Sequence, residues 1–228
     1  MSTYFCIYSV CCFYVFGFRS DATSQYIEGR EEVVEEGCLC PSGLQCALVL
    51  IGVYLRATGE PVIGVINQPF NHKDPTGWKG KHFWGVSCGS VKASSVLRPK
   101  ERPAQCPGLS VVSDRLMYAS GAGYKILCVI LGLADIYVLS EGSTFKWDSC
   151  DLRECLCFFH CEGGHHDQGE LTYHQSHSES PGADRWANQG GLVAYLDSET
   201  CFLSQSYQNV AHGYNSAFDW LRISVGLT

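Results

Sequence analysis

Positive charge is scarce in this sequence. Its 228 residues include 16 Lys and Arg against 23 Asp and Glu, which gives a net charge of −7. An acidic surface repels the phosphate backbones of DNA and RNA, so we expect no nucleic-acid partner. A small anionic ligand is still compatible with such a surface, provided that bound cations lie between the ligand and the protein.

Basic residues are also missing before the apolar, aromatic run at residues 4–18. A signal peptide begins with positive charge and a membrane-spanning helix needs about 20 apolar residues, so the run fits neither pattern. Around residues 11–16 it has no helix or strand period. We therefore expect residues 1–20 to be an aberrant leader outside the native fold, such as translated non-coding sequence or a mis-joined exon.

Cysteine, in contrast, is abundant, with 14 residues. Their spacing is irregular, and several, including Cys46 and Cys128, lie in apolar runs. Such cysteines behave as small buried hydrophobic residues in a reducing compartment. We expect thiols instead of disulfides and a cytoplasmic protein.

Cysteine and histidine crowd together at residues 155–166. Thiolates and imidazoles are the ligands of zinc, but this spacing matches no standard finger or ribbon. We expect an unstructured insert there, with a zinc site as the alternative.

The remaining pattern predicts a globular α/β protein, since 46% of the residues are hydrophobic and 17% are charged. Residues 44–55 and 62–66 predict a β-hairpin, and 82–86 a third strand after a polar loop at 71–81. Small residues at 120–125 open a predicted helix. They either let the backbone amides approach an anion or let the helix pack closely against its neighbours. Strands are expected at 136–139 and 191–195, whereas 94–108 and the tail from 198 show no regular pattern.

Two carboxylates, Asp21 and Asp148, stand out as possible metal ligands. Magnesium prefers carboxylate, water and phosphate oxygens, and two such ions activate an attacking water and stabilise a departing oxygen. Taken from spacing alone, each aspartate is better explained as the cap of a helix or turn.

A series of motifs resembles the inositol polyphosphate 1-phosphatases, a family within the lithium-sensitive, magnesium-dependent inositol monophosphatase superfamily. They occur in the family's order over more than half of the chain. The motifs are 43–46 (GLQC), 51–54 (IGVY), 64–70 (GVINQPF), 78–80 (WKG), 83–85 (FWG), 121–125 (GAGYK), 135–137 (DIY), 144–150 (TFKWDSC), 184–188 (DRWAN) and 190–192 (GGL).

The resemblance implies a layered α-β-α-β-α sandwich that is incomplete at its N-terminus. The phosphatase core would span residues 21–150, and 151–228 would be a remnant of the C-terminal half with a divergent tail. The enzyme would be a monomer that acts on small inositol phosphates, with no membrane partner.

The resemblance also implies the site. The family motif Asp-Pro-Ile-Asp-Ser/Gly-Thr places Asp21 and Thr23 at its second Asp and its Thr, and a Trp-Asp motif ends at Asp148. Asp21 and Asp148 would hold Mg²⁺, with Thr23 as a further catalytic residue. The amides of Ala22 and Thr23 would face the 1-phosphate. The inositol and its second phosphate would be lined by Gly121, Lys125 and Ser143.

Several positions depart from the family. Phe18 takes the place of the first Asp of the motif, and Arg19-Ser20 that of Pro-Ile. The family's metal-binding Glu lies upstream, and a helix after Cys150 is skipped. These departures favour a truncated or mis-spliced copy, and the glutamates at 31–32 and 35–36 are expected to be solvated surface charges.

Three functions follow as hypotheses. The first is a magnesium-dependent, lithium-sensitive phosphomonoesterase that removes the 1-phosphate of inositol 1,4-bisphosphate and inositol 1,3,4-trisphosphate. The second is a catalytically inactive homologue that retains some ligand binding. The third is a small membrane-anchored or zinc-binding protein.

Overall fold

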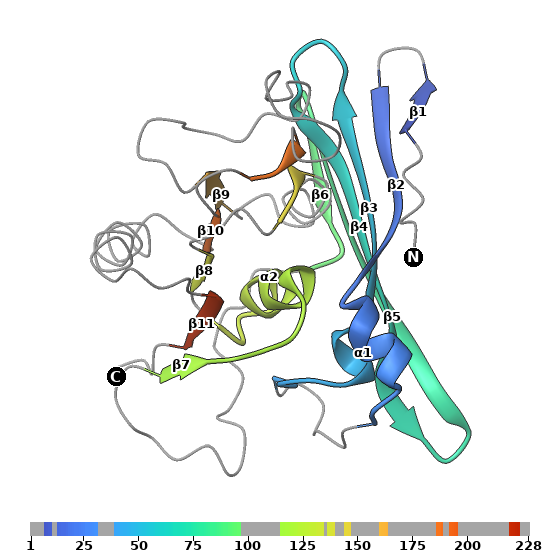
Figure 1. Cartoon of the computed structure of the whole chain (residues 1–228). Coiled ribbons are helices and arrows are strands. Elements are labelled where there is room, and N and C mark those ends of the chain that lie inside the picture. Colours follow the sequence, from blue (N-terminus) through green and yellow to red (C-terminus); the bar gives the residue numbers. More distant parts are fainter. Residues whose placement is uncertain are drawn as a thin grey trace.

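Two antiparallel sheets with a helix between them form the part of the chain that the structure describes (Figure 1). The computed structural model describes residues 7–10, 13–31, 39–96, 115–134, 136–139, 144–146, 160–163, 186–188, 192–195 and 219–223. The helix is α2 (Ala122–Ile130), and the larger sheet carries the shorter helix α1 (Thr23–Glu28) at one end (Figure 1).

The larger sheet has six strands in sequence order. These are β1 (Ile7–Val10), β2 (Phe13–Asp21), β3 (Leu48–Leu55), β4 (Pro61–Asp74), β5 (Gly77–Cys88) and β6 (Val91–Ser94). Buried and half-buried residues alternate along β3, as a strand with one face on the core requires. Leu48 and Leu50 point to the core, and Val49 and Ile51 to the outer face.

The predicted hairpin is confirmed, because β3 pairs with β4 in antiparallel register with Ile51 opposite Val65. β3 begins later than expected, at Leu48, because Leu44–Cys46 form the 3-10 helix η1. The third strand is also confirmed as β5. Gly59, in the turn between β3 and β4, has φ 73°, a conformation that glycine adopts without steric cost.

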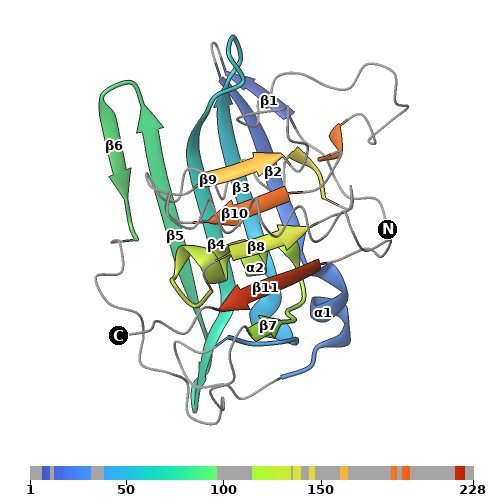
Figure 2. The ribbon, with the colours of Figure 1, turned by 90° about the vertical axis from the view of Figure 1, so that its left-hand side faces the viewer.

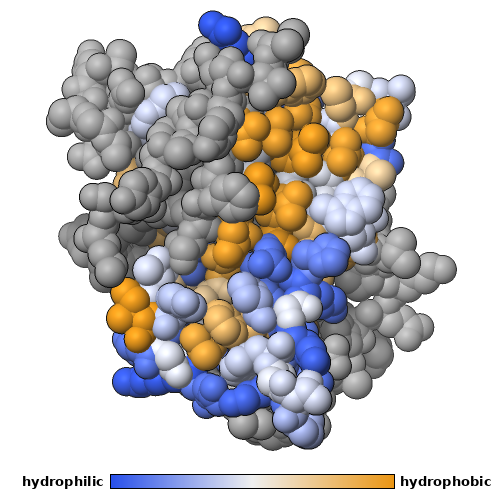
Figure 3. Space-filling view, turned by 90° about the vertical axis from the view of Figure 1, so that its right-hand side faces the viewer, coloured by the Kyte–Doolittle hydropathy of each residue, from blue (hydrophilic) through white to orange (hydrophobic). Residues whose placement is uncertain are grey.

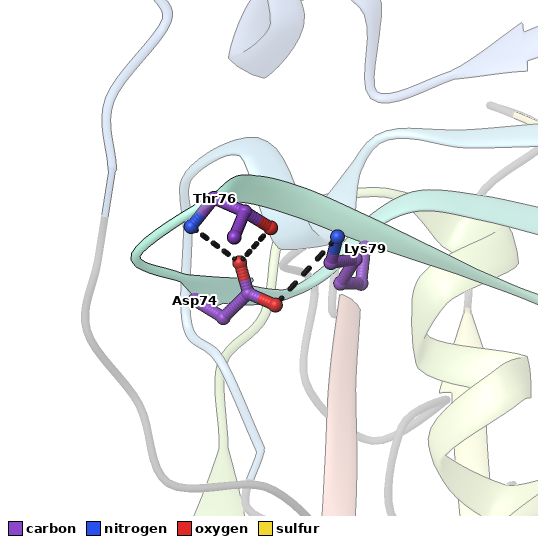
Figure 4. Close-up of polar contacts among 3 residues, drawn as sticks. All are labelled: Asp74, Thr76 and Lys79. Carbon is purple, nitrogen blue, oxygen red and sulfur yellow. Dashed lines mark hydrogen bonds and ion pairs between the residues drawn. The ribbon is translucent and has the colours of Figure 1, made fainter.

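The polar loop predicted at 71–81 is wrong, since β4 and β5 continue through most of it and leave a tight turn (Figure 4). One carboxylate oxygen of Asp74 accepts hydrogen bonds from the Thr76 amide at 2.7 Å and its hydroxyl at 2.6 Å. The other lies 3.6 Å from Lys79. The Thr76 hydroxyl and amide and the charge of Lys79 hold the pKa of Asp74 below its usual value. A polar composition alone did not reveal this turn chemistry.

The N-terminal apolar run differs from its expectation as well. Residues 7–10 and 13–21 form β1 and β2, and β2 pairs with β3 from Phe13 to Asp21 across an irregularity between Phe16 and Arg19. The expected boundary after residue 20 thus falls inside β2. Residues 13–16 are apolar at every position, so the sequence shows no alternation there that would mark a strand.

The second sheet has five strands in the order β7-β11-β8-β10-β9. These are β7 (Arg115–Met117), β8 (Ile136–Leu139), β9 (His160–Gly163), β10 (Leu192–Tyr195) and β11 (Asp219–Ile223). β8 and β10 were predicted. β9 and β11 correct the expectations of an unstructured Cys/His insert and a patternless tail, because they pair with β10 and β8. Such pairing stabilises short segments that carry little signal of their own.

The core passes from one sheet through α2 to the other. It joins Leu50 and Ile66 of the large sheet, Ile126 and Leu127 of α2, and Tyr137 of the small sheet. The strands of the small sheet run across those of the large one, with α2 between them (Figure 2). This β-α-β arrangement is the centre of the expected α-β-α-β-α sandwich.

One part of the outer face of the large sheet is apolar, whereas the lower part in this view is mostly hydrophilic (Figure 3). Ile63 and Trp84 lie on it with 37% and 39% of their surface exposed, next to half-buried Val53 and Val65. Within the described ranges no helix covers this face. None of the helices in those ranges is long and apolar enough to cross a membrane.

We predict that Ile126→Ala lowers the free energy of unfolding by about 2–5 kcal/mol, because a fully buried side chain between two sheets leaves a cavity. The matched control is Val91→Ala on exposed β6, which should change it by less than about 0.5 kcal/mol. Urea denaturation measures both. Equal effects would contradict the placement of α2 in the core.

Thiol labelling offers a second test. Cys40, Cys46 and Cys128 are buried thiols, whereas Cys88 is exposed, and burial raises the pKa of the Cys128 thiol well above its usual value. We predict that a maleimide modifies Cys88 rapidly and these three cysteines only in denaturant, as followed by peptide mass mapping. Rapid labelling of Cys128 in folded protein would contradict the core described above.

Candidate active site

Asp21 is the last residue of β2, and its carboxylate lies against the start of α2. Its Oδ2 accepts a hydrogen bond from the Tyr124 amide at 3.1 Å. That amide belongs to the first turn of the helix, where backbone N–H groups have no partner within the helix and favour negative charge. Two segments 103 residues apart in sequence therefore meet at one carboxylate.

Two glycines make room for this carboxylate. A Cβ atom on Gly121 would lie 2.6 Å from Asp21 Oδ2, and one on Gly123 would lie 2.9 Å from the same oxygen. Gly121 also has φ 85°, where a side chain is strained. The small residues at this helix start thus allow both the backbone conformation and the close approach of Asp21.

The chain reverses sharply after Asp21. Ala22 has φ 52° and ψ 44°, and among the described residues it is the one non-glycine with positive φ. This left-handed conformation costs an L-residue about 1–2 kcal/mol and persists where surrounding contacts enforce it. Thr23 follows as the first residue of α1, and its side chain is exposed.

Lys125 occupies a different environment from the one expected of a substrate-binding lysine. Its side chain is 2% exposed. Its Nζ lies 5.3 Å from the ring centre of Tyr137 and 5.7 Å from that of Tyr118, which is within range of cation–π attraction. The lysine is thus one residue away from the amide that binds Asp21, but it is enclosed by aromatic rings.

The segments at 144–146 and 186–188 meet beside the small sheet. Asn188 donates from its backbone to the Thr144 carbonyl at 2.8 Å and from its side chain to the Thr144 hydroxyl at 3.1 Å. Burial lowers the pKa of Lys146.

Two predicted site residues, Ser143 and Asp148, lie outside the described residues. The structure brings together the other predicted residues Asp21, Ala22, Thr23 and Gly121, and Lys125 lies one helical turn after Gly121 on α2.

Gly121, Gly123 and the Tyr124 amide form a cradle that makes room for the Asp21 carboxylate itself. A carboxylate oxygen is a ligand that Mg²⁺ prefers, so Asp21 fits a hard divalent cation. In the part of the chain that the structure describes, no group of three or more His, Cys, Asp and Glu side chains is placed to hold a metal ion. Further ligands would have to come from other residues, as the prediction for Asp148 requires.

Tyr124 and Gln25 are parts of this site that sequence reasoning missed. Tyr124 binds Asp21 through its amide, and its hydroxyl accepts the Cys40 amide at 2.9 Å. Burial raises the pKa of Tyr124 far above its usual value, so the phenol stays protonated. Gln25 accepts the Gly43 amide at 2.7 Å. A motif identifies neither contact, because both depend on segments that are distant in sequence.

Comparison with known proteins supports the family resemblance of the sequence motifs. Residues 21–152 match the model of the inositol monophosphatase family. The chain is 40% identical to human inositol polyphosphate 1-phosphatase and 39% to the bovine protein, over 84% of this chain and 60% of each relative. It is 28% identical to human 3'(2'),5'-bisphosphate nucleotidase 1 over 83% of the chain.

Two antiparallel sheets around a central helix, with an aspartate set in its glycine-rich start, define an α/β fold with a built acidic site. The chain belongs to the inositol monophosphatase family. It spans about 60% of the length of the inositol polyphosphate 1-phosphatases that it matches.

We predict that Gly123→Ala destabilises the protein by about 1–3 kcal/mol, because the added methyl group crowds Asp21 and Leu50. Without that crowding, alanine would stabilise a helix by about 1 kcal/mol relative to glycine. Denaturant unfolding measures the difference, and a stabilising substitution would contradict the close packing of Asp21 on α2.

Gly89 gives a reference for a glycine that has positive φ but no crowding. Gly121 and Gly89 both have positive φ, but a Cβ on Gly89 meets nothing within 4 Å. Gly89→Ala should therefore cost about 1–2 kcal/mol from the left-handed backbone. Gly121→Ala should cost more, and equal losses would show that Asp21 is not held in this cradle.

Proposed function

We propose that this protein is a magnesium-dependent phosphomonoesterase that removes the 1-phosphate of inositol 1,4-bisphosphate and inositol 1,3,4-trisphosphate. The observation that carries the proposal is the carboxylate of Asp21 at the start of α2, held by the Tyr124 amide and enclosed by Gly121 and Gly123. The names of its inositol polyphosphate 1-phosphatase relatives support the substrate class.

The proposed roles follow from the motif matches. Asp21 and Asp148 would hold a Mg²⁺ ion that, when bound, stabilises the leaving oxygen of the inositol. Thr23 acts with them, and the amides of Ala22 and Thr23 orient the 1-phosphate. Gly121, Lys125 and Ser143 line the inositol and its second phosphate. Because Lys125 is enclosed by Tyr118 and Tyr137, its role requires the exposed ring of Tyr118 to move aside.

A second candidate is a catalytically inactive homologue that keeps some ligand binding. The observation that favours it is Phe18, which stands where the family motif has its first aspartate. A phenyl ring is no ligand for a hard, strongly hydrated ion. We therefore propose that Asp21 still binds a cation but that the activation of water is weakened. The protein is further proposed to be a cytoplasmic, lithium-sensitive monomer.

The expected result is slow release of phosphate from inositol 1,4-bisphosphate at saturating Mg²⁺, far below the rate of an intact relative. Release should stop in EDTA, and Asp21→Asn and Asp148→Asn should each abolish it, because each amide replaces a charged ligand. A colorimetric phosphate assay measures these rates.

Asp74→Asn is the control, since Asp74 lies in the turn between β4 and β5 and takes no part in the proposed site. It should keep the wild-type rate. Release that survives EDTA and both site substitutions would overturn the proposal, whereas substrate binding without turnover would favour the inactive homologue.

A further inference from the structure

The turn that carries Asp21 is held from two sides by one short segment, residues 40–43. On the α2 side, the Cys40 amide donates to the Tyr124 hydroxyl at 2.9 Å, and the Pro41 carbonyl accepts the Ser120 amide at 3.0 Å. On the α1 side, the Gly43 amide donates to Gln25 Oε1 at 2.7 Å. The segment therefore links the helix that receives the carboxylate with the helix that follows it.

These contacts close a ring. Asp21 is bonded to Tyr124, Tyr124 to Cys40, and Gly43, three residues further on, to Gln25. Gln25 returns to the starting turn through its own amide, which donates to the Ala22 carbonyl at 2.9 Å. Ala22 is the residue in the strained left-handed conformation, which is maintained where several contacts fix it at once.

Gln25 is the side chain in this ring that α1 supplies. No residue of α1 is buried; Gln25 is half-buried, and Tyr26 lies against Phe70 of β4 with ring centres 6.0 Å apart. Gly43 is buried, so its amide depends on a protein acceptor and not on water. Contacts made directly to metal-binding side chains typically contribute about 10- to 100-fold to metal affinity, and Gln25 would act on Asp21 one step further out, through the turn at Ala22.

We propose that Gln25 is a positioning residue for the cation site at Asp21, acting through the Gly43 amide and the left-handed turn at Ala22. The inference rests on the proposed function, in which Asp21 binds a divalent cation. Gln25 touches neither the cation nor the substrate in this account; its amide oxygen fixes where the carboxylate of Asp21 points.

The test is the affinity for Mn²⁺, followed by the loss of the free-ion signal in electron paramagnetic resonance, in the full chain. Gln25→Met keeps the length of the side chain but removes the acceptor, and should raise the Kd about 10-fold or more. Gln25→Glu restores an acceptor oxygen and should bind within about threefold of wild type. Should Gln25→Met fail to fold, Gln25→Asn, which withdraws the oxygen by one methylene, takes its place.

Gln68→Met is the matched control. Gln68 is a buried amide that bonds to the chain just after this segment, since its Nε2 donates to the Gln45 carbonyl at 2.9 Å, and it lies on β4 instead of α1. It should lower the melting temperature and leave the Mn²⁺ affinity unchanged. Hydrogen exchange gives a second readout: Gln25→Met, and not Gln68→Met, should accelerate exchange of the Gln25 and Tyr124 amides.

The outcomes are distinct. Wild-type affinity in Gln25→Met, or equal losses in Gln25→Met and Gln68→Met, overturns the positioning role while the cation site stands. Wild-type protein that binds Mn²⁺ no better than Asp21→Asn overturns the proposed function itself, and the positioning role with it.

Discussion

The carboxylate of Asp21 lies close against the start of α2 because one backbone amide binds it and two glycines place no side chain in its way. The Tyr124 amide binds the oxygen, and Gly121 and Gly123 let it approach within a distance that no Cβ would permit. Because β2 delivers Asp21 and α2 lies between the sheets, this contact requires the large sheet, the central helix and their packing to be correct at once. A hydrogen bond to a charged acceptor contributes about 1.5–3 kcal/mol, so this partly buried contact also helps to fix the helix against the sheet.

Placing the carboxylate at this helix start has a chemical consequence. The partial positive charge of the helix start favours the ionised carboxylate, which is the form that binds a cation. The same positive end also attracts an anionic substrate. A cation between carboxylate and phosphate would thus reconcile an acidic protein, with its net charge of −7, with the binding of an inositol phosphate.

The sequence was informative where a pattern is local. Two apolar runs joined by a short turn predicted the pairing of β3 with β4, and the small residues at 120–125 predicted the helix that became α2. It was uninformative for β9 and β11, which are short and owe their strand conformation to β10 and β8. It was likewise uninformative for β2, because residues 13–16 are apolar at every position and show no alternation. In the site, Asp21 and Gly121 could be paired only through the family resemblance, since 100 residues separate them. Gln25 and the hydroxyl of Tyr124 gave no signal, because their partners are backbone amides that any residue could supply.

The central claim is that a divalent cation binds at the carboxylate of Asp21 beside the start of α2. Crystals grown with Mn²⁺, an ion that accepts the same oxygen ligands as Mg²⁺, allow the ion to be located by its anomalous scattering. The account predicts an anomalous peak within coordination distance of an Asp21 carboxylate oxygen, absent in Asp21→Asn crystals. Well-occupied Mn²⁺ elsewhere in the molecule, with no peak at Asp21, would contradict it.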